Sequence, residues 1–258
     1  MLLAIDSGNT NIVFALFDGD EVKGQWRFST DPGRTADEFG VWLIQLMTIE
    51  NVDRSAISAC IIASVVPALD FTLKSLCRRY FSCEPMIVGD DGVKLGIGIK
   101  MERPEEVGAD RLVNAVAAHK AYGGALIVID FGTATTFDVV DGDGNYCGGA
   151  IAPGPNLSME ALHMAAAKLP RVGIGRPRQG QVIGKSTVGA MRSGVYWGYV
   201  GLIEGLVRRI KDEYGGPMRV VATGGLAPLF NEATSAIDIL DSGLTLRGLL
   251  AIYRLNRP

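Results

Sequence analysis

Two short stretches of similar composition contain the residues best suited to bind a phosphorylated ligand. The first runs Ala4-Ile5-Asp6-Ser7-Gly8-Asn9-Thr10-Asn11, and the second runs Ile129-Asp130-Phe131-Gly132-Thr133-Ala134-Thr135-Thr136. In each, an apolar run ends at an aspartate, a glycine follows two positions later, and small polar residues lead into another apolar run. This combination suits a magnesium–triphosphate, because carboxylates hold the metal's waters while backbone amides bind phosphate oxygens.

The spacing of the two aspartates suggests an internal duplication. Asp6 and Asp130 are 124 positions apart (130 minus 6) in a chain of 258 residues, about half its length. Each stretch reads as strand, tight turn, strand. Two ordinary aspartate-containing turns in an α/β sheet are the alternative. The matched pair favours two acidic hairpins that face each other across a cleft.

The elements around each hairpin follow the same pattern. Apolar runs separated by turn residues predict a three-stranded meander in each half of the chain. The expected strands are Leu2–Asp6, Asn11–Phe17 and Val22–Ser29, then Ala125–Asp130, Ala134–Val140 and Tyr146–Ile151. Helical periodicity follows each meander. We therefore expect an α/β protein with an N-terminal domain over residues 1–120 and a C-terminal domain over residues 121–258.

Two further helices bear on function. Pro104 is expected to open a helix that runs through Asp110 and stops at Gly123-Gly124. A long helix is expected over Ser186–Tyr214. It contains five glycines, each costing about 1 kcal/mol in a helix interior, so they indicate close helix–helix contact and are compatible with a dimer interface. The glycines are Gly189, Gly194, Gly198, Gly201 and Gly205.

A third carboxylate is a candidate general base. Asp110, in Gly108-Ala109-Asp110-Arg111, stands near a helix start in the segment that joins the two halves. Phosphoryl transfer to a hydroxyl needs a carboxylate that orients the acceptor and takes its proton. Arg111 could hold an acidic acceptor by a bidentate pair. The alternative is a first-turn helix charge with a surface ion pair.

Composition excludes several other classes of protein. The chain is 48% hydrophobic and 21% charged, typical of a soluble globular protein, and its net charge of −3 favours neither nucleic acid nor an anionic membrane. Its apolar runs are too short to span a membrane, and the start lacks a signal peptide. The four cysteines have no zinc spacing, and Cys60 is expected to be a buried thiol. We expect a cytoplasmic protein.

Two local patterns are rejected as ligand loops. Gly180–Ser186 resembles a P-loop, but it has one residue too few between its glycines and no preceding apolar strand. Asp141–Asn145 begins like a calcium loop, but Tyr146 occupies the position that requires glycine, so a hairpin turn is expected.

Six motifs in order resemble the type III pantothenate kinase family over nearly the whole chain. They are D-x-G-N-T-N (Asp6–Asn11), G-A-D-R (Gly108–Arg111), D-F-G-T-A-T-T (Asp130–Thr136), G-G-A-I-A-P-G (Gly148–Gly154), G-K-S-T (Gly184–Thr187) and T-G-G (Thr223–Gly225). The first three together are highly specific. The resemblance implies two duplicated ribonuclease-H-like domains, the actin-like fold of the acetate and sugar kinase superfamily.

The resemblance also implies an activity. Members are homodimers that phosphorylate pantothenate with ATP, the first step toward coenzyme A, and require Mg²⁺ and a monovalent cation, K⁺ or NH₄⁺. Asp110 would be the general base, Asp6 would hold magnesium through water, and Asp130 would hold the monovalent cation. The implied ATP-binding residues are Asp6, Ser7, Gly8, Asn9, Thr10, Asn11, Ile12, Val13, Gly132, Thr133, Gly224 and Gly225. The implied pantothenate-binding residues are Gly108, Ala109, Asp110, Arg111, Thr187 and Met101.

One position departs from the family pattern. Many members carry tyrosine seven residues before the G-A-D-R glycine, where this chain has Met101. A thioether fills similar space but donates no hydrogen bond, which puts that single contact in doubt. Two other functions stay open: a non-catalytic nucleotide-dependent regulatory switch of the same fold, and a polyphosphate or phosphatase relative that uses the hairpins on water.

Overall fold

The computed structural model describes residues 1–166 and 168–257. Contacts between residues divide the chain into two compact units. One unit comprises Met1–Gly98, Glu102–Lys120 and Leu244–Pro258, and the other comprises Ile99–Met101 and Ala121–Gly243. Within the described ranges, no helix combines the length and apolar composition that crossing a membrane requires.

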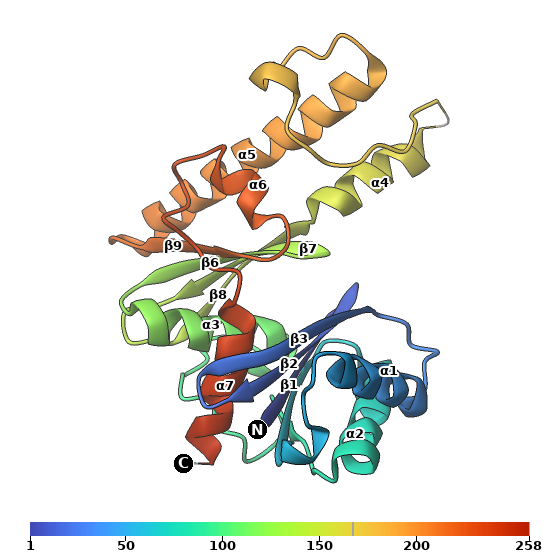
Figure 1. The fold of residues 1–258 in the computed structure, drawn as a ribbon. Coiled ribbons are helices and arrows are strands. Elements are labelled where there is room, and N and C mark those ends of the chain that lie inside the picture. Colours follow the sequence, from blue (N-terminus) through green and yellow to red (C-terminus); the bar gives the residue numbers. More distant parts are fainter. Residues whose placement is uncertain (167, 258) are drawn as a thin grey trace. The chain divides into compact units, whose positions relative to one another are not determined.

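The first unit is built on a five-stranded sheet with strand order β3-β2-β1-β4-β5 (Figure 1). Strands β1 to β3 form an antiparallel meander, and β4 and β5 run parallel to β1. The strands are β1 (Leu2–Ser7), β2 (Asn11–Asp18), β3 (Glu21–Ser29), β4 (Ala59–Ser64) and β5 (Met86–Ile87). Both expected meander turns, after Ser7 and after Asp18, are confirmed.

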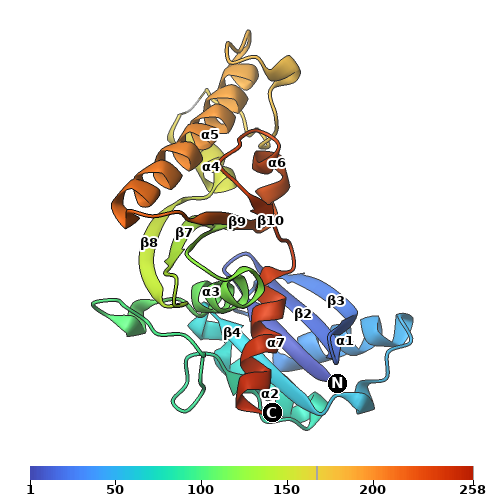
Figure 2. The same ribbon diagram turned by 90° about the vertical axis from the view of Figure 1, so that its left-hand side faces the viewer.

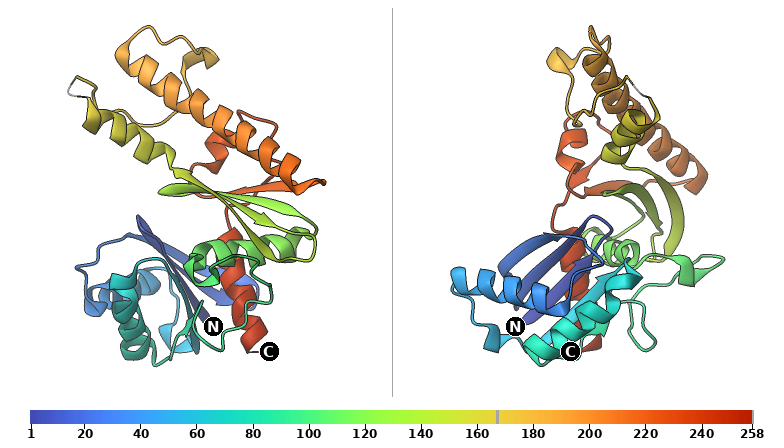
Figure 3. Two further views of the ribbon diagram at one scale, coloured as in Figure 1. Left: turned by 180° about the vertical axis from the view of Figure 1, so that it is seen from behind. Right: turned by 90° about the vertical axis from the view of Figure 1, so that its right-hand side faces the viewer.

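Helices cover both faces of this sheet because β1 and β4 are apolar on both sides. Leu3 and Ile5 pack with α1 (Ala36–Ile49) and α2 (Pro67–Phe81), which lie together in Figure 3. The alternate residues Leu2 and Ala4 pack with α3 (Ala109–Tyr122) and α7 (Leu244–Asn256). Helices α3 and α7 lie side by side in Figure 2, and they approach closely because Gly248 of α7 has no side chain at that contact, where a Cβ would lie 2.3 Å from the carbonyl oxygen of Val113.

The second unit contains a second five-stranded sheet, with order β10-β9-β6-β7-β8. Helix α5 (Thr187–Tyr214) and α6 (Ala227–Asn231) cover one face, where they enclose Ile129, Phe137 and Phe230. Helix α4 (Pro155–Ala165) packs beside α5, and both extend beyond the edge of the sheet (Figures 1 and 3). The strands are β6 (Leu126–Phe131), β7 (Ala134–Val140), β8 (Tyr146–Pro153), β9 (Arg219–Thr223) and β10 (Ile239–Leu240).

The two sheets have the same topology, which confirms the predicted α/β class and the duplication. Read from the third strand of each meander, the orders are β3-β2-β1-β4-β5 and β8-β7-β6-β9-β10. In both, the first strand pairs antiparallel with the second and parallel with the fourth. Both meanders also have a register irregularity between their second and third strands, at Leu16/Phe17 and at Asp138/Val140.

The prediction that a helix begins at Pro104 is wrong. Pro104–Glu106 forms a single 3₁₀ turn, Val107 is extended with φ −78° and ψ 121°, and α3 begins only at Ala109. Val107 is a buried β-branched residue, and its side chain packs best with the backbone extended. Asp110, expected near a helix start, therefore lies in the first turn of α3.

The C-terminal helix and the cysteines complete the fold. Helix α7 lies within residues 121–258, the expected C-terminal domain. By its contacts, however, α7 belongs to the first unit. Its apolar stripe, which includes Leu249 and Ile252, is fully buried among residues of that unit.

Cys60 is a buried thiol as predicted, and the described cysteines are all unbridged.

Candidate active site

The first acidic hairpin forms as predicted. Gly8 donates its N–H to the carbonyl oxygen of Asn11 at 3.0 Å, which closes the turn between β1 and β2. Asn9 and Thr10 at its tip are exposed. A Cβ at Gly8 would lie 3.2 Å from the oxygen of Asn11, so glycine allows the turn to close tightly. The exposed tip leaves backbone groups accessible to a ligand.

The residues of this hairpin divide between two faces of the sheet. Asp6 pairs with Val13, so their side chains lie on the face that carries α3 and α7. Ser7 and Ile12 also pair with each other, but they are buried on the opposite face with exposed fractions of 1% and 0%. Ser7 and Ile12 can therefore meet a nucleotide at the hairpin only through their backbone.

The structure brings the start of α3 to the end of the sheet that carries Asp6. Val65, the residue after β4, donates its N–H to the carbonyl oxygen of Ser7 at 3.0 Å. Gly108 lies next to Val65, where a Cβ would be 3.5 Å from Cγ1 of Val65. Because α3 packs on the face to which Asp6 points, Gly108 and Asp110 share both the end and the face of the sheet with Asp6.

Asp110 is held over the start of its own helix. Its Oδ1 accepts the N–H of Arg111 at 2.8 Å. The same oxygen occupies space that a side chain at Gly108 would need, 2.7 Å from an ideal Cβ. A carboxylate in the first turn of a helix is stabilised by the helix dipole. Asp110 is thus a charge at the start of a helix, as the alternative reading expects. Its carboxylate is also held beside the backbone of Gly108 and Arg111.

The second hairpin is also closed by its glycine, but its turn is one residue shorter than the first. Gly132 donates its N–H to the carbonyl oxygen of Ala134 at 3.0 Å, and Gly132 and Thr133 are exposed at the tip. Gly154, which ends the G-G-A-I-A-P-G motif, donates its N–H to Thr133 at 2.9 Å, and a Cβ at Gly154 would lie 2.4 Å from that carbonyl oxygen. This second motif therefore packs against the turn.

Gly224 of the T-G-G motif lies against Asp130. A Cβ at Gly224 would be 2.6 Å from Oδ1 of Asp130 and 2.7 Å from the carbonyl oxygen of Phe131. Gly224 has φ +92°, a conformation that favours glycine. A carboxylate oxygen, a carbonyl oxygen and the backbone nitrogen of Phe131, also 2.7 Å from the ideal Cβ, thus surround the place where Gly224 has no side chain. Oxygen donors of this kind suit hard cations.

The structure places Thr187 apart from the second hairpin. Thr187 is the exposed first residue of α5, which Ser186 caps by accepting the N–H of Gly189 at 3.1 Å. Tyr199, twelve residues later (199 minus 187), lies 3.4 Å from the hydroxyl of Thr135 beside the hairpin. Twelve helical residues span about 18 Å. Gly184–Thr187 caps a helix with no strand before it, which agrees with the rejection of a P-loop.

Sequence patterns do not single out Thr30, which follows β3 and supports the first hairpin. Its hydroxyl donates to the carbonyl oxygen of Gly8 at 2.6 Å, and its N–H donates to that of Thr10 at 2.9 Å. These bonds use the carbonyl oxygens of Gly8 and Thr10 and hold the turn against the residue that follows β3. The only signal was a hydroxyl residue at the end of a predicted strand, which is too common to be specific.

We expect Thr30→Val to weaken the binding of magnesium–ATP about three- to tenfold, because one hydrogen bond to the turn contributes about 0.5–1.5 kcal/mol. Thr30→Ser keeps the hydroxyl and is the matched control. Isothermal titration calorimetry with a non-hydrolysable ATP analogue measures both variants. Equal affinity of Thr30→Val and the wild type would show that the turn holds its shape without this bond.

Structural comparison defines the class of protein first. An inorganic polyphosphate/ATP-glucomannokinase from Arthrobacter sp. strain KM matches with a TM-score of 0.54, 14% identity and 98% of each chain covered. Component A of (R)-2-hydroxyglutaryl-CoA dehydratase from Acidaminococcus fermentans matches with a TM-score of 0.52 and 14% identity, over 100% of this chain and 99% of that one. These likenesses over nearly the whole of each chain confirm the predicted fold.

Sequence comparison then identifies the family. The family model for type III pantothenate kinase matches residues 2–209. A type III pantothenate kinase of Paramagnetospirillum magneticum is 75% identical over 99% of this chain and 98% of its own. Another, from Rhodospirillum rubrum, is 70% identical over the full length of both chains. This chain belongs to the type III pantothenate kinase family, an enzyme family of phosphotransferases.

Proposed function

We propose that this protein transfers the γ-phosphoryl group of ATP to the primary hydroxyl of pantothenate, which gives 4′-phosphopantothenate, the first step of coenzyme A biosynthesis. The observation that carries the proposal is the position of Asp110 within the first unit. The start of α3 shares one end and one face of the sheet with the Asp6 hairpin. An acceptor hydroxyl held at Gly108–Arg111 would therefore lie on the same side as phosphates bound at the hairpin.

In the proposed reaction, Asp110 accepts the proton of the pantothenate hydroxyl as its oxygen bonds to the γ-phosphorus. The bond from that phosphorus to the bridging oxygen breaks in line, and ADP leaves. The exposed turns, including Thr10 and Thr133, bind phosphate oxygens through backbone N–H groups. Such sites act mainly by positioning and by electrostatic stabilisation of the transferred group. The flat backbone at Gly224 and Gly225 is the proposed place for the nucleoside.

Two cations complete the proposed site. Kinases usually hold magnesium through one or two carboxylates, water and substrate phosphates, and the half-buried carboxylate of Asp6 at the hairpin fits that role. Magnesium would neutralise charge on the phosphates. The convergence of the Asp130 carboxylate and the Phe131 carbonyl at Gly224 supports a monovalent cation, K⁺ or NH₄⁺, at Asp130.

The residues proposed to bind pantothenate are Gly108, Ala109, Asp110, Arg111, Met101 and Thr187.

We also propose that the protein is a homodimer. Gly194, Gly198 and Gly201 of α5 face open space, where a Cβ would meet no described atom of the chain within 4 Å. A second copy of α5 would cover this glycine face. A monomer in sedimentation equilibrium would contradict the proposal.

The assay that tests the function measures ADP release with magnesium–ATP. We expect release that requires both pantothenate and potassium, and that falls when sodium replaces potassium. Release without pantothenate would point to an ATPase or another acceptor. No release under any condition would favour the nucleotide-dependent regulatory switch. Mass spectrometry of the product identifies which hydroxyl receives the phosphoryl group.

A further inference from the structure

Residues 99–101, called the strap, belong to the second unit, whereas the residues on either side belong to the first. Gly98 and Glu102 are both in the first unit by their contacts. Within the strap, Ile99 forms a parallel bridge with Tyr146, the first residue of β8, and Lys100 donates its N–H to the Tyr146 carbonyl oxygen at 2.8 Å. This backbone pairing is short, so side chains must contribute to its order.

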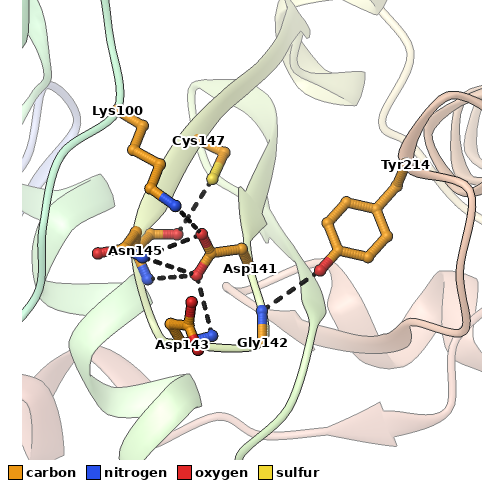
Figure 4. Close-up of polar contacts among 7 residues, drawn as sticks. All are labelled: Lys100, Asp141, Gly142, Asp143, Asn145, Cys147 and Tyr214. Atoms are coloured by element: carbon orange, nitrogen blue, oxygen red, sulfur yellow. Dashed lines mark hydrogen bonds and ion pairs between the residues drawn. The ribbon is translucent and has the colours of Figure 1, made fainter.

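The main side-chain attachment of the strap is an ion pair between Lys100 and Asp141. The Lys100 Nζ lies 2.7 Å from Oδ2 of Asp141 (Figure 4). The lysine side chain is 58% exposed, but that of Asp141 is only 13% exposed. A flexible, exposed lysine usually gains little from a surface ion pair. Here the partner of the lysine, the Asp141 carboxylate, is already held in place by other hydrogen bonds.

The turn after β7 fixes the Asp141 carboxylate. Oδ1 accepts the N–H of Asn145 at 2.8 Å and that of Asp143 at 3.0 Å, and the Asn145 side-chain amide donates to both carboxylate oxygens. Burial raises the pKa of Asp141, but the hydrogen bonds from Lys100 and Asn145 outweigh it and hold the pKa well below its usual range. The carboxylate therefore stays charged at neutral pH. The turn that resembles a calcium loop in sequence binds the lysine of the strap.

The residue after Lys100 is Met101, which the ion pair places against the G-G-A-I-A-P-G motif. The Met101 sulfur lies 3.0 Å from the position that a Cβ would take on Gly148, whose φ is +92°. Gly148 thus leaves room for the thioether, whose side chain is unbranched and flexible. Met101 makes this contact at the surface, with 36% of the residue exposed. Its position depends on the order of the strap.

We propose that Lys100 is a positioning residue for the acceptor substrate: its ion pair with Asp141 holds the strap on β8 and so fixes the position of Met101. This inference rests on the proposed function, because it takes Met101 as a pantothenate-binding residue. It assigns a role to Lys100 and Asp141 that the kinase motifs do not include.

The test compares Lys100→Met with Lys100→Arg and Asp143→Asn. Lys100→Met removes the charge and keeps an unbranched side chain, and we expect KM for pantothenate to rise about three- to fivefold, the upper range for a surface ion pair. The kcat and the KM for ATP should change less than about twofold, since Met101 is proposed to bind only the acceptor. Lys100→Arg should restore most of the loss. Asp143→Asn removes a neighbouring charge whose side chain makes no hydrogen bond among the described residues, and it should match the wild type.

Hydrogen exchange gives a readout that does not depend on activity. The Lys100 amide is bonded to Tyr146, so a peptide covering residues 99–102 should exchange faster in Lys100→Met than in Lys100→Arg. Faster exchange with an unchanged KM for pantothenate would overturn the role of the strap in pantothenate binding, and unchanged exchange would overturn the ion pair as its anchor. The two failures can be told apart. If the wild type shows no pantothenate-dependent ADP release, the proposed function fails. If hydrogen exchange of the strap is unchanged in Lys100→Met, the role of the ion pair fails, whatever the kinase activity.

Discussion

Asp110→Asn is expected to lower kcat by about 10²–10⁴-fold, the usual contribution of a positioned general base. The amide has almost the same shape as the carboxylate, and its oxygen can still accept the N–H of Arg111 that Asp110 accepts at 2.8 Å. The helix start should therefore remain formed. The charge at the first turn is lost, and its interaction with the helix dipole contributes about 0.3–1 kcal/mol.

The measurement separates chemistry from folding. Steady-state kinetics should show the loss in kcat, while calorimetry should show magnesium–ATP binding and a melting temperature close to those of the wild type. Asp37→Asn is the matched control, because Asp37 is an exposed carboxylate in the first turn of α1 in the same unit. It should leave kcat unchanged. Wild-type turnover in Asp110→Asn would remove Asp110 from the mechanism.

Gly224→Ala is expected to lower the free energy of unfolding of the second unit by about 3 kcal/mol. A left-handed conformation costs an L-residue about 1–2 kcal/mol, and Gly224 has φ +92°. The new methyl group would lie 2.6 Å from Asp130 Oδ1 and 2.7 Å from the backbone N and O of Phe131. Overpacking of this kind costs about 1–3 kcal/mol more.

Differential scanning calorimetry measures this effect. A loss of about 3 kcal/mol should lower the melting temperature by roughly 6–12 °C for a protein of this size. Gly225→Ala is the control for stability, because a Cβ at Gly225 meets nothing within 4 Å, and it should stay within about 1 kcal/mol of the wild type. Equal melting temperatures for the two variants would contradict the contact between the T-G-G motif and Asp130. Since Asp130 must move in Gly224→Ala, the potassium concentration for half-maximal activity should also rise.

The sequence alone determined the two hairpins and the duplicated class of fold. Alternating apolar residues, an aspartate at the strand end and a glycine in the turn are local features, and each acts within about ten residues of chain. The same local features occur around Asp6 and Asp130, so the sequence by itself predicts that the two hairpins are equivalent. The motifs Gly108–Arg111 and Thr223–Gly225 were also found as candidates from their residues.

Only the tertiary structure decided which residues support those motifs. Without the register shift at Leu16/Phe17, the β2–β3 hairpin would place Ser29 opposite Thr10; with it, Thr30 supports the turn. A bulge results from twist and from packing against neighbouring strands, so the local sequence does not fix its position.

The position of Asp110 and the course of the chain ends are also long-range effects. The start of α3 depends on the burial of Val107, which no local helix signal at Pro104 could reveal. Helix α7 packs in the first unit because its apolar stripe fits beside α3, more than 120 residues earlier in the chain. The ion pair of Lys100 with Asp141 joins residues 41 positions apart. Local propensity determines which elements and turns form, whereas burial of apolar faces between distant segments determines where the catalytic side chains lie.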